Sequence, residues 1–229
     1  MTVTPPPIAQ RRPYRHSYHG VDLDDPYFWL QDPGYPQVED TDVLAYLDEE
    51  NAYFESWYEP HRGLTQTLFE ELKGRKPEQD ESVPYEKNGY RYQWRFNAGD
   101  QYRVWLRQAI TDDSEQWSTL LNENTLAVGC EYFRLGALTV SPDGTKLAYS
   151  TDTNGSERFT LQVINIATGD ALTTAIENCA GSVVWNADSN GFAYLLVNAN
   201  WRPDKALYRA LINDEDTLLY QEKDDSFFV

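Results

Sequence analysis

The sequence has only two cysteines among its 229 residues. Cys130 and Cys179 lie far apart, and neither belongs to a Cys-x-x-Cys pair. A zinc ribbon and a disulfide scaffold are therefore excluded, and a reducing cytoplasm fits this cysteine content best.

Long apolar runs are also missing. No run of about 18 apolar residues occurs anywhere, so no membrane-spanning helix is expected. The first residues carry Pro5–Pro7, Arg11 and Arg12 and offer no apolar stretch for a signal-peptide core. We therefore expect a cytoplasmic protein that is not bound to a membrane.

Basic residues are scarce, with 19 Lys and Arg against 37 Asp and Glu, which gives a formal net charge of −18. Such a field repels phosphate backbones, so nucleic acid is excluded as a partner. It would attract basic peptides, but it could equally serve only to keep the protein soluble. Charge alone leaves both interpretations open.

The common catalytic motifs are absent. The 13 glycines form no G-x-S-x-G, no G-x-G-x-x-G and no G-x-x-x-x-G-K-[ST] sequence, which leaves no nucleophile elbow, dinucleotide loop or phosphate loop. His16, His19 and His61 are the only candidates for an imidazole base. His16 and His19 could share a metal, but no further His or Cys lies nearby. We expect no catalytic, cofactor-binding or metal-binding residue in this chain.

Two acidic groupings are candidate sites. Asp22-Leu-Asp-Asp25 lacks the glycine and the final glutamate of a calcium-binding loop. It leads into Pro26-Tyr-Phe-Trp-Leu30 and is interpreted as a turn before an aromatic anchor. Glu49 and Glu50 are expected on the solvated face of a helix.

The N-terminal part is predicted to be an extended arm over residues 1–20, followed by two helices. Helical spacing begins at Asp42, with Thr41 or Asp42 as the cap and Pro60 marking the end. The second helix is expected to end at Gly74 in a left-handed conformation. The apolar positions that indicate these helices are Val43, Leu44, Leu47, Phe54, Tyr58, Leu64, Leu68 and Leu72.

After a charged linker over residues 75–84, the pattern changes to short β-like runs. The composition supports this, because 14% of the residues are aromatic. Asn88-Gly89 predicts a hairpin, and Pro142-Asp143-Gly144 predicts a turn. Phe159, Leu161 and Val163 alternate with polar residues, as in a half-buried strand.

These signals repeat. Residues 140–149 correspond to residues 184–194 with one insertion, and the Ala-Tyr pairs at 148–149 and 193–194 lie 45 residues apart. Four short strands with a period in the mid-forties are typical of β-propeller blades. About three blades fit between residues 83 and 219, and residues 220–229 are interpreted as the start of a fourth. Because propellers close with four to eight blades, we expect a longer chain.

Several segments resemble the prolyl oligopeptidase family of serine peptidases, in the order that the family has. The N-terminal segments are Asp24-Asp-Pro-Tyr-Phe-Trp-Leu30 and Leu44–Tyr53. Four further segments resemble the oligopeptidase B branch in particular, namely Asp80–Tyr85, Tyr132–Asp143, Gly181–Trp185 and Glu222–Phe228. The resemblance to the family is weaker over residues 97–108, and Cys130 stands where the family is expected to have a polar residue.

The resemblance implies a mainly β chain with an α N-terminal segment. Residues 1–80 would be an arm and helices that wrap a C-terminal α/β-hydrolase domain, and residues 81–229 would be part of a seven-bladed propeller. The hydrolase domain, with its Ser-Asp-His triad, would follow residue 229, so this chain alone should be inactive. The family cleaves short peptides, and this branch cleaves after Arg or Lys. The alternative is a non-catalytic module that binds peptides or proteins through an incomplete propeller.

Overall fold

A computed structural model describes residues 5–34, 37–112, 114, 116–224 and 226–229. The chain forms two compact units, Met1–Lys76 and Pro77–Val229. Within the described residues, no helix has the length and apolar character needed to cross a membrane. The boundary expected between residues 80 and 81 falls inside the short strand β3, Asp80–Glu81.

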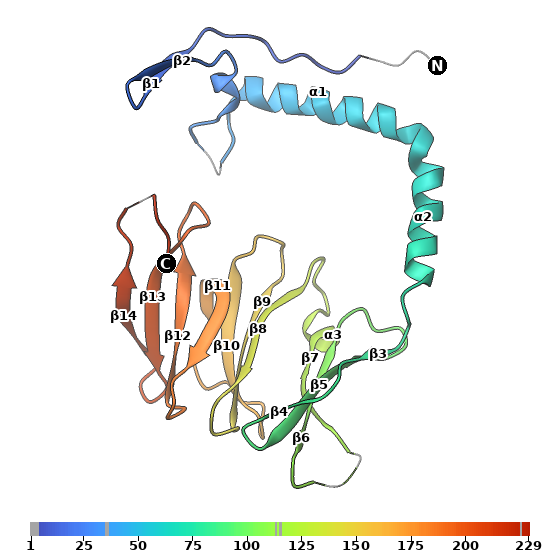
Figure 1. The fold of residues 1–229 in the computed structure, drawn as a ribbon, viewed down its shortest axis with the longest axis vertical. Coiled ribbons are helices and arrows are strands. Elements are labelled where there is room, and N and C mark those ends of the chain that lie inside the picture. Colours follow the sequence, from blue (N-terminus) through green and yellow to red (C-terminus); the bar gives the residue numbers. More distant parts are fainter. Residues whose placement is uncertain (1–4, 35–36, 113, 115, 225) are drawn as a thin grey trace. The chain divides into compact units, whose positions relative to one another are not determined.

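The first unit contains a small hairpin and two helices (Figure 1). The hairpin was not predicted, because residues 1–20 were expected to form only an extended arm. That prediction was wrong for residues 15–20. His19 and Gly20 both have positive φ and form the tight turn. Asp22 and Asp24 therefore lie on a strand, and only Asp25 has the predicted role of a turn residue. The elements are β1 (Arg15–Tyr18), β2 (Val21–Asp24), η1 (Phe28–Leu30), α1 (Thr41–Tyr58), η2 (Glu59–His61) and α2 (Arg62–Gly74).

Both predicted helices are present, but their ends differ from the predictions. Asp40 caps α1, because its carboxylate accepts hydrogen bonds from the backbone N–H groups of Asp42 and Val43. The prediction of Thr41 or Asp42 as the cap was wrong. Gly74 is the last residue of α2 and has no positive φ. The helix ends instead through the N–H of Arg75, which donates to two carbonyls of the last turn.

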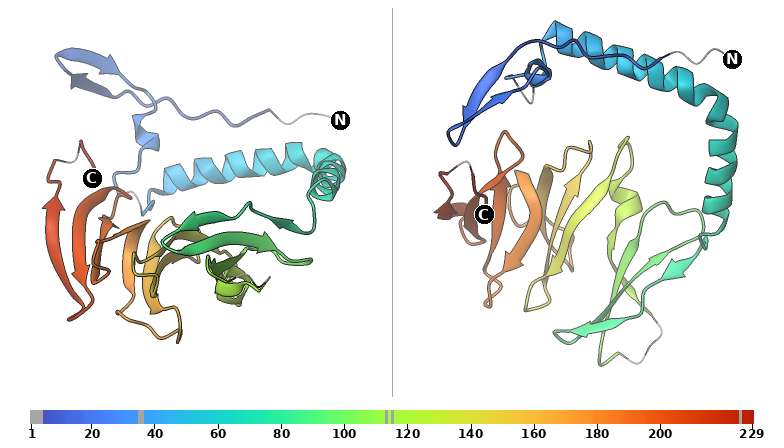
Figure 2. Two further views of the ribbon diagram at one scale, coloured as in Figure 1. Left: turned by 60° about the horizontal axis from the view of Figure 1, so that its bottom comes forward. Right: turned by 45° about the horizontal axis from the view of Figure 1, so that its top comes forward.

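The second unit is built from antiparallel strands in three successive sets of four, called units A, B and C here (Figures 1 and 2). Unit A has β3 and β4 (Tyr85–Lys87) as one interrupted inner strand, then β5 (Tyr90–Phe96), β6 (Val104–Ala109) and β7 (Ser118–Asn122). Helix α3 (Glu123–Leu126) leads to unit B, which has β8 (Arg134–Val140), β9 (Lys146–Asp152), β10 (Phe159–Asn165) and the first half of β11 (Ile176–Trp185). Unit C has the second half of β11, β12 (Gly191–Val197), β13 (Pro203–Ala210) and β14 (Glu215–Gln221).

Strand β11 belongs to both unit B and unit C. Ile176 and Cys179 pair with β10, and Val183–Trp185 pair with β12, while Cys179 also pairs with Leu196 of β12. Gly181 has a φ of 84° in the irregular segment between the two pairings. Hydrogen bonding therefore runs without a break from β8 to β14. Units A and B belong to separate sheets, with α3 between them in the chain.

The core lies between the faces of neighbouring units. Along β9, alternate side chains point to opposite faces of the sheet. Leu147 and Tyr149 pack with Tyr92, Leu120 and Leu121 of unit A. Ala148 belongs to the second cluster, with Phe159, Leu161, Val163, Ile176, Cys179, Phe192 and Tyr194. The predicted alternation at Phe159, Leu161 and Val163 is confirmed, since all three are buried.

The predicted turns are confirmed, and one strand assignment is wrong. Asn88 and Gly89 join β4 to β5, and residues 141–145 join β8 to β9. Tyr220 was expected to begin a fourth blade, but it lies in β14 and pairs with Ala206 of β13. Val229 also contacts β13, because its N–H donates to the carbonyl of Pro203 at 2.9 Å.

Candidate functional site

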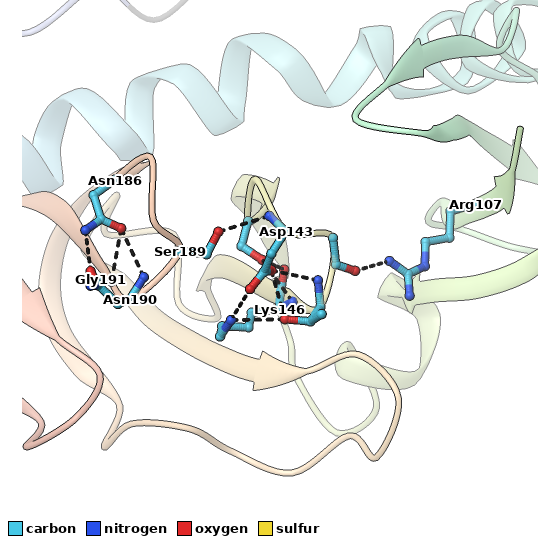
Figure 3. Close-up of polar contacts among 10 residues, drawn as sticks. Arg107, Asp143, Lys146, Asn186, Ser189, Asn190 and Gly191 are labelled. Atoms are coloured by element: carbon cyan, nitrogen blue, oxygen red, sulfur yellow. Dashed lines mark hydrogen bonds and ion pairs between the residues drawn. The ribbon is translucent and has the colours of Figure 1, made fainter.

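The turns between the first and second strands of units B and C, together with Arg107 of unit A, form a polar network (Figure 3). We call this set the turn network; its residues are Arg107, Ser141, Asp143, Gly144, Thr145, Lys146, Asn186, Ser189, Asn190 and Gly191. Gly144 has a φ of 73° and Ser189 a φ of 58°, at equivalent points of the two turns. The repeat in the sequence is therefore a repeat of backbone conformation.

The Asp143 carboxylate organises the turn of unit B. It accepts hydrogen bonds from the Ser141 hydroxyl at 2.6 Å and from the Lys146 ammonium at 2.5 Å. The backbone N–H and the hydroxyl of Thr145 donate to it at 2.9 and 2.8 Å. Burial alone would raise the pKa of Asp143, but these hydrogen bonds outweigh that effect and hold the pKa far below its usual range. The carboxylate is charged at neutral pH.

Two contacts of the turn network cross from one unit to the next. The backbone N–H of Asp143 donates to the Ser189 hydroxyl at 3.0 Å, which ties unit B to unit C. The Arg107 guanidinium donates to the Gly144 carbonyl at 2.7 Å, which ties unit A to unit B. Arg107 also lies over the Tyr90 ring at 4.6 Å. A Cβ at position 144 would come within 2.9 Å of that ring, so the close approach favours glycine.

The turn network can orient neighbouring units. Asn186 plays the central role in unit C, because its side-chain oxygen accepts from the N–H groups of Asn190 and Gly191. The indole N–H of Trp185 adds another link to unit B by donating to the Thr139 carbonyl at 3.1 Å. The chemistry of the network is therefore the fixing of adjacent blades in a defined register.

The three histidines are not brought together as a metal site, and no group of metal-ligating side chains occurs among the described residues. His16 lies on β1 among aromatic rings, 5.9 Å from the Phe28 ring centroid. His19 lies in the hairpin turn, and His61 lies beside Trp57 at a centroid distance of 4.9 Å. The expectation of no catalytic or metal residue stays a prediction.

The other candidate side chains have ordinary structural partners. Asp24 pairs with Arg15 at 2.7 Å, and the Asp25 carboxylate accepts from the Tyr27 N–H at 3.0 Å. Glu49 is exposed on α1, whereas Glu50 is half-buried and accepts a hydrogen bond from the Tyr46 hydroxyl. Asp24, Asp25 and Glu50 thus each have a structural partner within the first unit.

Both cysteines are free thiols, and they differ in how deeply they are buried. Cys130 is half-buried. Cys179 is fully buried in the core between units B and C. Desolvation raises the pKa of Cys179 to about 12, so this thiol stays protonated and is not a nucleophile.

Sequence reasoning missed Arg107 and Ser189, which make the contacts between units. The Pro-Asp-Gly turn was recognised as a local signal, but nothing in it names a partner 46 residues away. The available signal was the correspondence between residues 140–149 and 184–194. When the two turns are aligned, Ser189 takes the position of Gly144. Because this position has a positive φ, which favours glycine, a serine there indicates that its side chain has a role.

Comparisons with known proteins agree with this architecture. The family model described as "Prolyl oligopeptidase, N-terminal beta-propeller domain" matches residues 6–229. Dipeptidyl aminopeptidase BI of Pseudoxanthomonas mexicana is 31% identical over 100% of this chain and 34% of its own length. Protease 2 of Moraxella lacunata is 29% identical over 96% of this chain and 32% of its own length.

Solved structures show the same fold. Oligopeptidase B from Trypanosoma brucei gives a TM-score of 0.74 at 27% identity and covers 95% of this chain and 32% of its own. Oligopeptidase B from Leishmania major gives a TM-score of 0.79 at 23% identity, with 98% and 34% covered. The chain thus spans about a third of the length of the relatives that it matches. It belongs to the prolyl oligopeptidase family, of which it forms the N-terminal β-propeller portion.

Proposed function

We propose that this chain is the propeller portion of a serine-type oligopeptidase that hydrolyses short peptides after Arg or Lys. Its own task is to exclude large substrates and to gate the entrance, whereas catalysis belongs to a C-terminal α/β-hydrolase domain. The observation that carries the proposal is the family match over residues 6–229, in a chain whose three units stack through the turn network. The two free cysteines support a cytoplasmic location.

The helices of the first unit supply a surface on which the proposed hydrolase domain can dock. Of the described residues in this unit, Val43 alone is buried. Large apolar side chains on α1 and α2 remain exposed, which is unusual for helices of a self-sufficient domain. Those most exposed are Phe54, Trp57, Leu64, Leu68, Phe69 and Leu72, at 48–65%.

The proposed mechanism is acyl transfer by the hydrolase domain. A serine would attack the scissile carbonyl while a histidine takes up its proton, and backbone N–H groups would hold the oxyanion. The residues of this chain take no part in these steps. They would form a rigid wall, because the turn network fixes each unit against the next, and a rigid wall admits only short, flexible peptides.

The negative charge of the chain supports the preference for basic peptides. A formal net charge of −18 raises the local concentration of cationic substrates near the entrance. If this holds, salt should lower kcat/KM for Arg-containing peptides in the longer enzyme, because counterions screen the attraction. A neutral peptide cleaved at the same bond is the control.

The decisive experiment compares the 229-residue chain with a longer protein that also carries the hydrolase domain. A chromogenic peptide ending in Arg should be cleaved by the longer protein and not by the 229-residue chain. Removing residues 77–229 from the longer protein should allow cleavage of peptides longer than about 30 residues, if the propeller excludes them. Unchanged size selectivity would refute gating, and turnover by the 229-residue chain would refute the assignment of catalysis.

A further inference from the structure

A groove between units A and B has the size of a small-ligand site. It has a volume of about 470 Å³, within the usual range for such sites. Its walls are aromatic and come from the end of β5, the start of β6 and the segment before β8. The aromatic residues are Phe96, Tyr102, Trp105 and Phe133.

Arg103 holds its guanidinium at this groove with hydrogen-bond donors still available. Its guanidinium carbon lies 4.5 Å from the Trp94 ring centroid and 5.9 Å from that of Trp105. A cation–π contact of this kind holds the guanidinium beside the rings without using its N–H groups. Within the described residues, no acceptor is hydrogen-bonded to the Arg103 side chain, although the chain has almost twice as many acidic as basic residues. A planar fork in this state suits a carboxylate.

The remaining charges of the groove favour an anion over a cation. Arg134 adds a second guanidinium, which forms an ion pair with Glu157 at 2.8 Å. Glu123 is the acidic residue of the lining, and it is only 7% exposed. Its carboxylate accepts from the Trp105 indole N–H at 2.6 Å. Burial raises the pKa of Glu123, whereas the hydrogen bond from Trp105 and the nearby charge of Arg103 act in the opposite direction. The lining therefore holds two guanidinium groups against one carboxylate.

One wall of the groove comes from a strand at the end of its sheet. Leu135, Gly136 and Leu138 belong to β8, which pairs on one side with β9 and is the terminal strand in the described part of the chain. Terminal strands leave main-chain groups for an extended peptide to use. The groove thus combines a guanidinium fork that can bind a carboxylate, an aromatic wall and the edge of a terminal strand.

We propose that this groove binds the C-terminal end of a short peptide, with the terminal carboxylate on Arg103 and the last side chain against the aromatic wall. Binding here requires no cleavage, so the site stands even if the proposed peptidase activity is absent. It is distinct from a preference for basic residues at the cleaved bond, because the group recognised is the terminal carboxylate.

Isothermal titration of the 229-residue chain tests the proposal. The probes are acetyl-Ala-Phe with a free carboxylate, the same peptide as its C-terminal amide, and phenylacetate. The free acid should bind at least about tenfold more tightly than the amide, as expected for charge-assisted hydrogen bonds. Binding should also shift the NMR signal of the Trp105 indole N–H, which places the ligand in the groove.

Arg103→Gln should remove the difference between acid and amide. Arg103→Lys keeps the positive charge but loses the paired N–H donors of the guanidinium. It should therefore retain only part of the difference in affinity between acid and amide. Arg95→Gln is the matched control, because Arg95 is exposed on β5 and lies outside this groove. The proposal is overturned if acid and amide bind alike, if Arg103→Gln keeps the difference, or if phenylacetate binds as tightly as the peptide. Circular dichroism confirms that each variant is folded.

Discussion

At the scale of single residues, Asp143 links a local turn to the packing of neighbouring units. Its carboxylate fixes the turn whose N–H reaches Ser189 and whose carbonyl receives Arg107. We expect Asp143→Asn to lower the free energy of unfolding by about 1–2 kcal/mol at pH 7, because hydrogen bonds to a charged acceptor are lost. The ion pair with Lys146 is partly exposed and adds little.

The effect of Asp143→Asn should depend on pH in a defined direction. The pKa of Asp143 is lowered in the folded state, so its contribution is fully present above the unfolded pKa of about 4. It is lost progressively as the pH falls below that value. Urea unfolding should therefore show the difference between wild type and variant narrowing from pH 7 to pH 3. Asp188→Asn is the control, since Asp188 is exposed and accepts no hydrogen bond from the described residues. A difference that stays constant with pH would contradict this account.

Ser189 offers a second prediction at this scale, because two effects oppose each other there. The residue is 2% exposed and has a φ of 58°, a conformation that costs a non-glycine residue about 1 kcal/mol. Its hydroxyl accepts the hydrogen bond from Asp143. Ser189→Ala loses this bond and keeps the strain, whereas Ser189→Gly loses the bond and relieves the strain. The alanine variant should be the less stable by about 1 kcal/mol in urea unfolding. Equal stabilities would show that strain is unimportant at this position.

At the scale of elements, the N-terminus of α1 gives a direct test of the corrected cap. Asp40 satisfies the N–H groups of Asp42 and Val43, so Asp40→Ala should destabilise the helix by about 1 kcal/mol. Hydrogen exchange of those two amides should accelerate about fivefold. Thr41→Ala, which removes one of the two residues that the sequence predicts as the cap, should leave both exchange rates nearly unchanged. The opposite ranking would restore Thr41 as the cap.

The elements also show how far sequence reasoning extends. Hairpin turns such as Asn88-Gly89 and the alternation at Phe159–Val163 were predictable, because their signals lie within a few residues. The double pairing of β11 was not, since it depends on strands on both sides of it. The hairpin at His19-Gly20 was missed because strands β1 and β2 are short and largely exposed and therefore lack a buried alternating face.

The residues of the candidate sites could likewise be predicted from the sequence only in part. Asp143 was found from a turn motif, but its partners Ser189 and Arg107 come from other units and required coordinates. Arg103 and Glu123 carried no motif at all. Their environment arises only when β6, α3 and β8 converge on one groove.

At the scale of the whole molecule, the two compact units differ sharply in core content. In the described part of the first unit Val43 is the sole buried residue, whereas the second unit holds two apolar clusters. Burial of apolar surface is the main source of stability, so the second unit should resist opening and the first should open readily. The junction is also accessible, because every residue from Glu71 to Asp80 is exposed.

Limited trypsin digestion tests this difference. Cleavage should occur first after Lys73 or Arg75 and within the first unit, leaving a resistant fragment that runs to Val229 and begins at Gly74 or Lys76. The bond after Lys76 should survive, because proline follows it. Mass spectrometry of the early products identifies the fragment, and circular dichroism should show its β signal retained after the helical signal is lost. Simultaneous loss of both units would mean that the first unit contributes to the stability of the second.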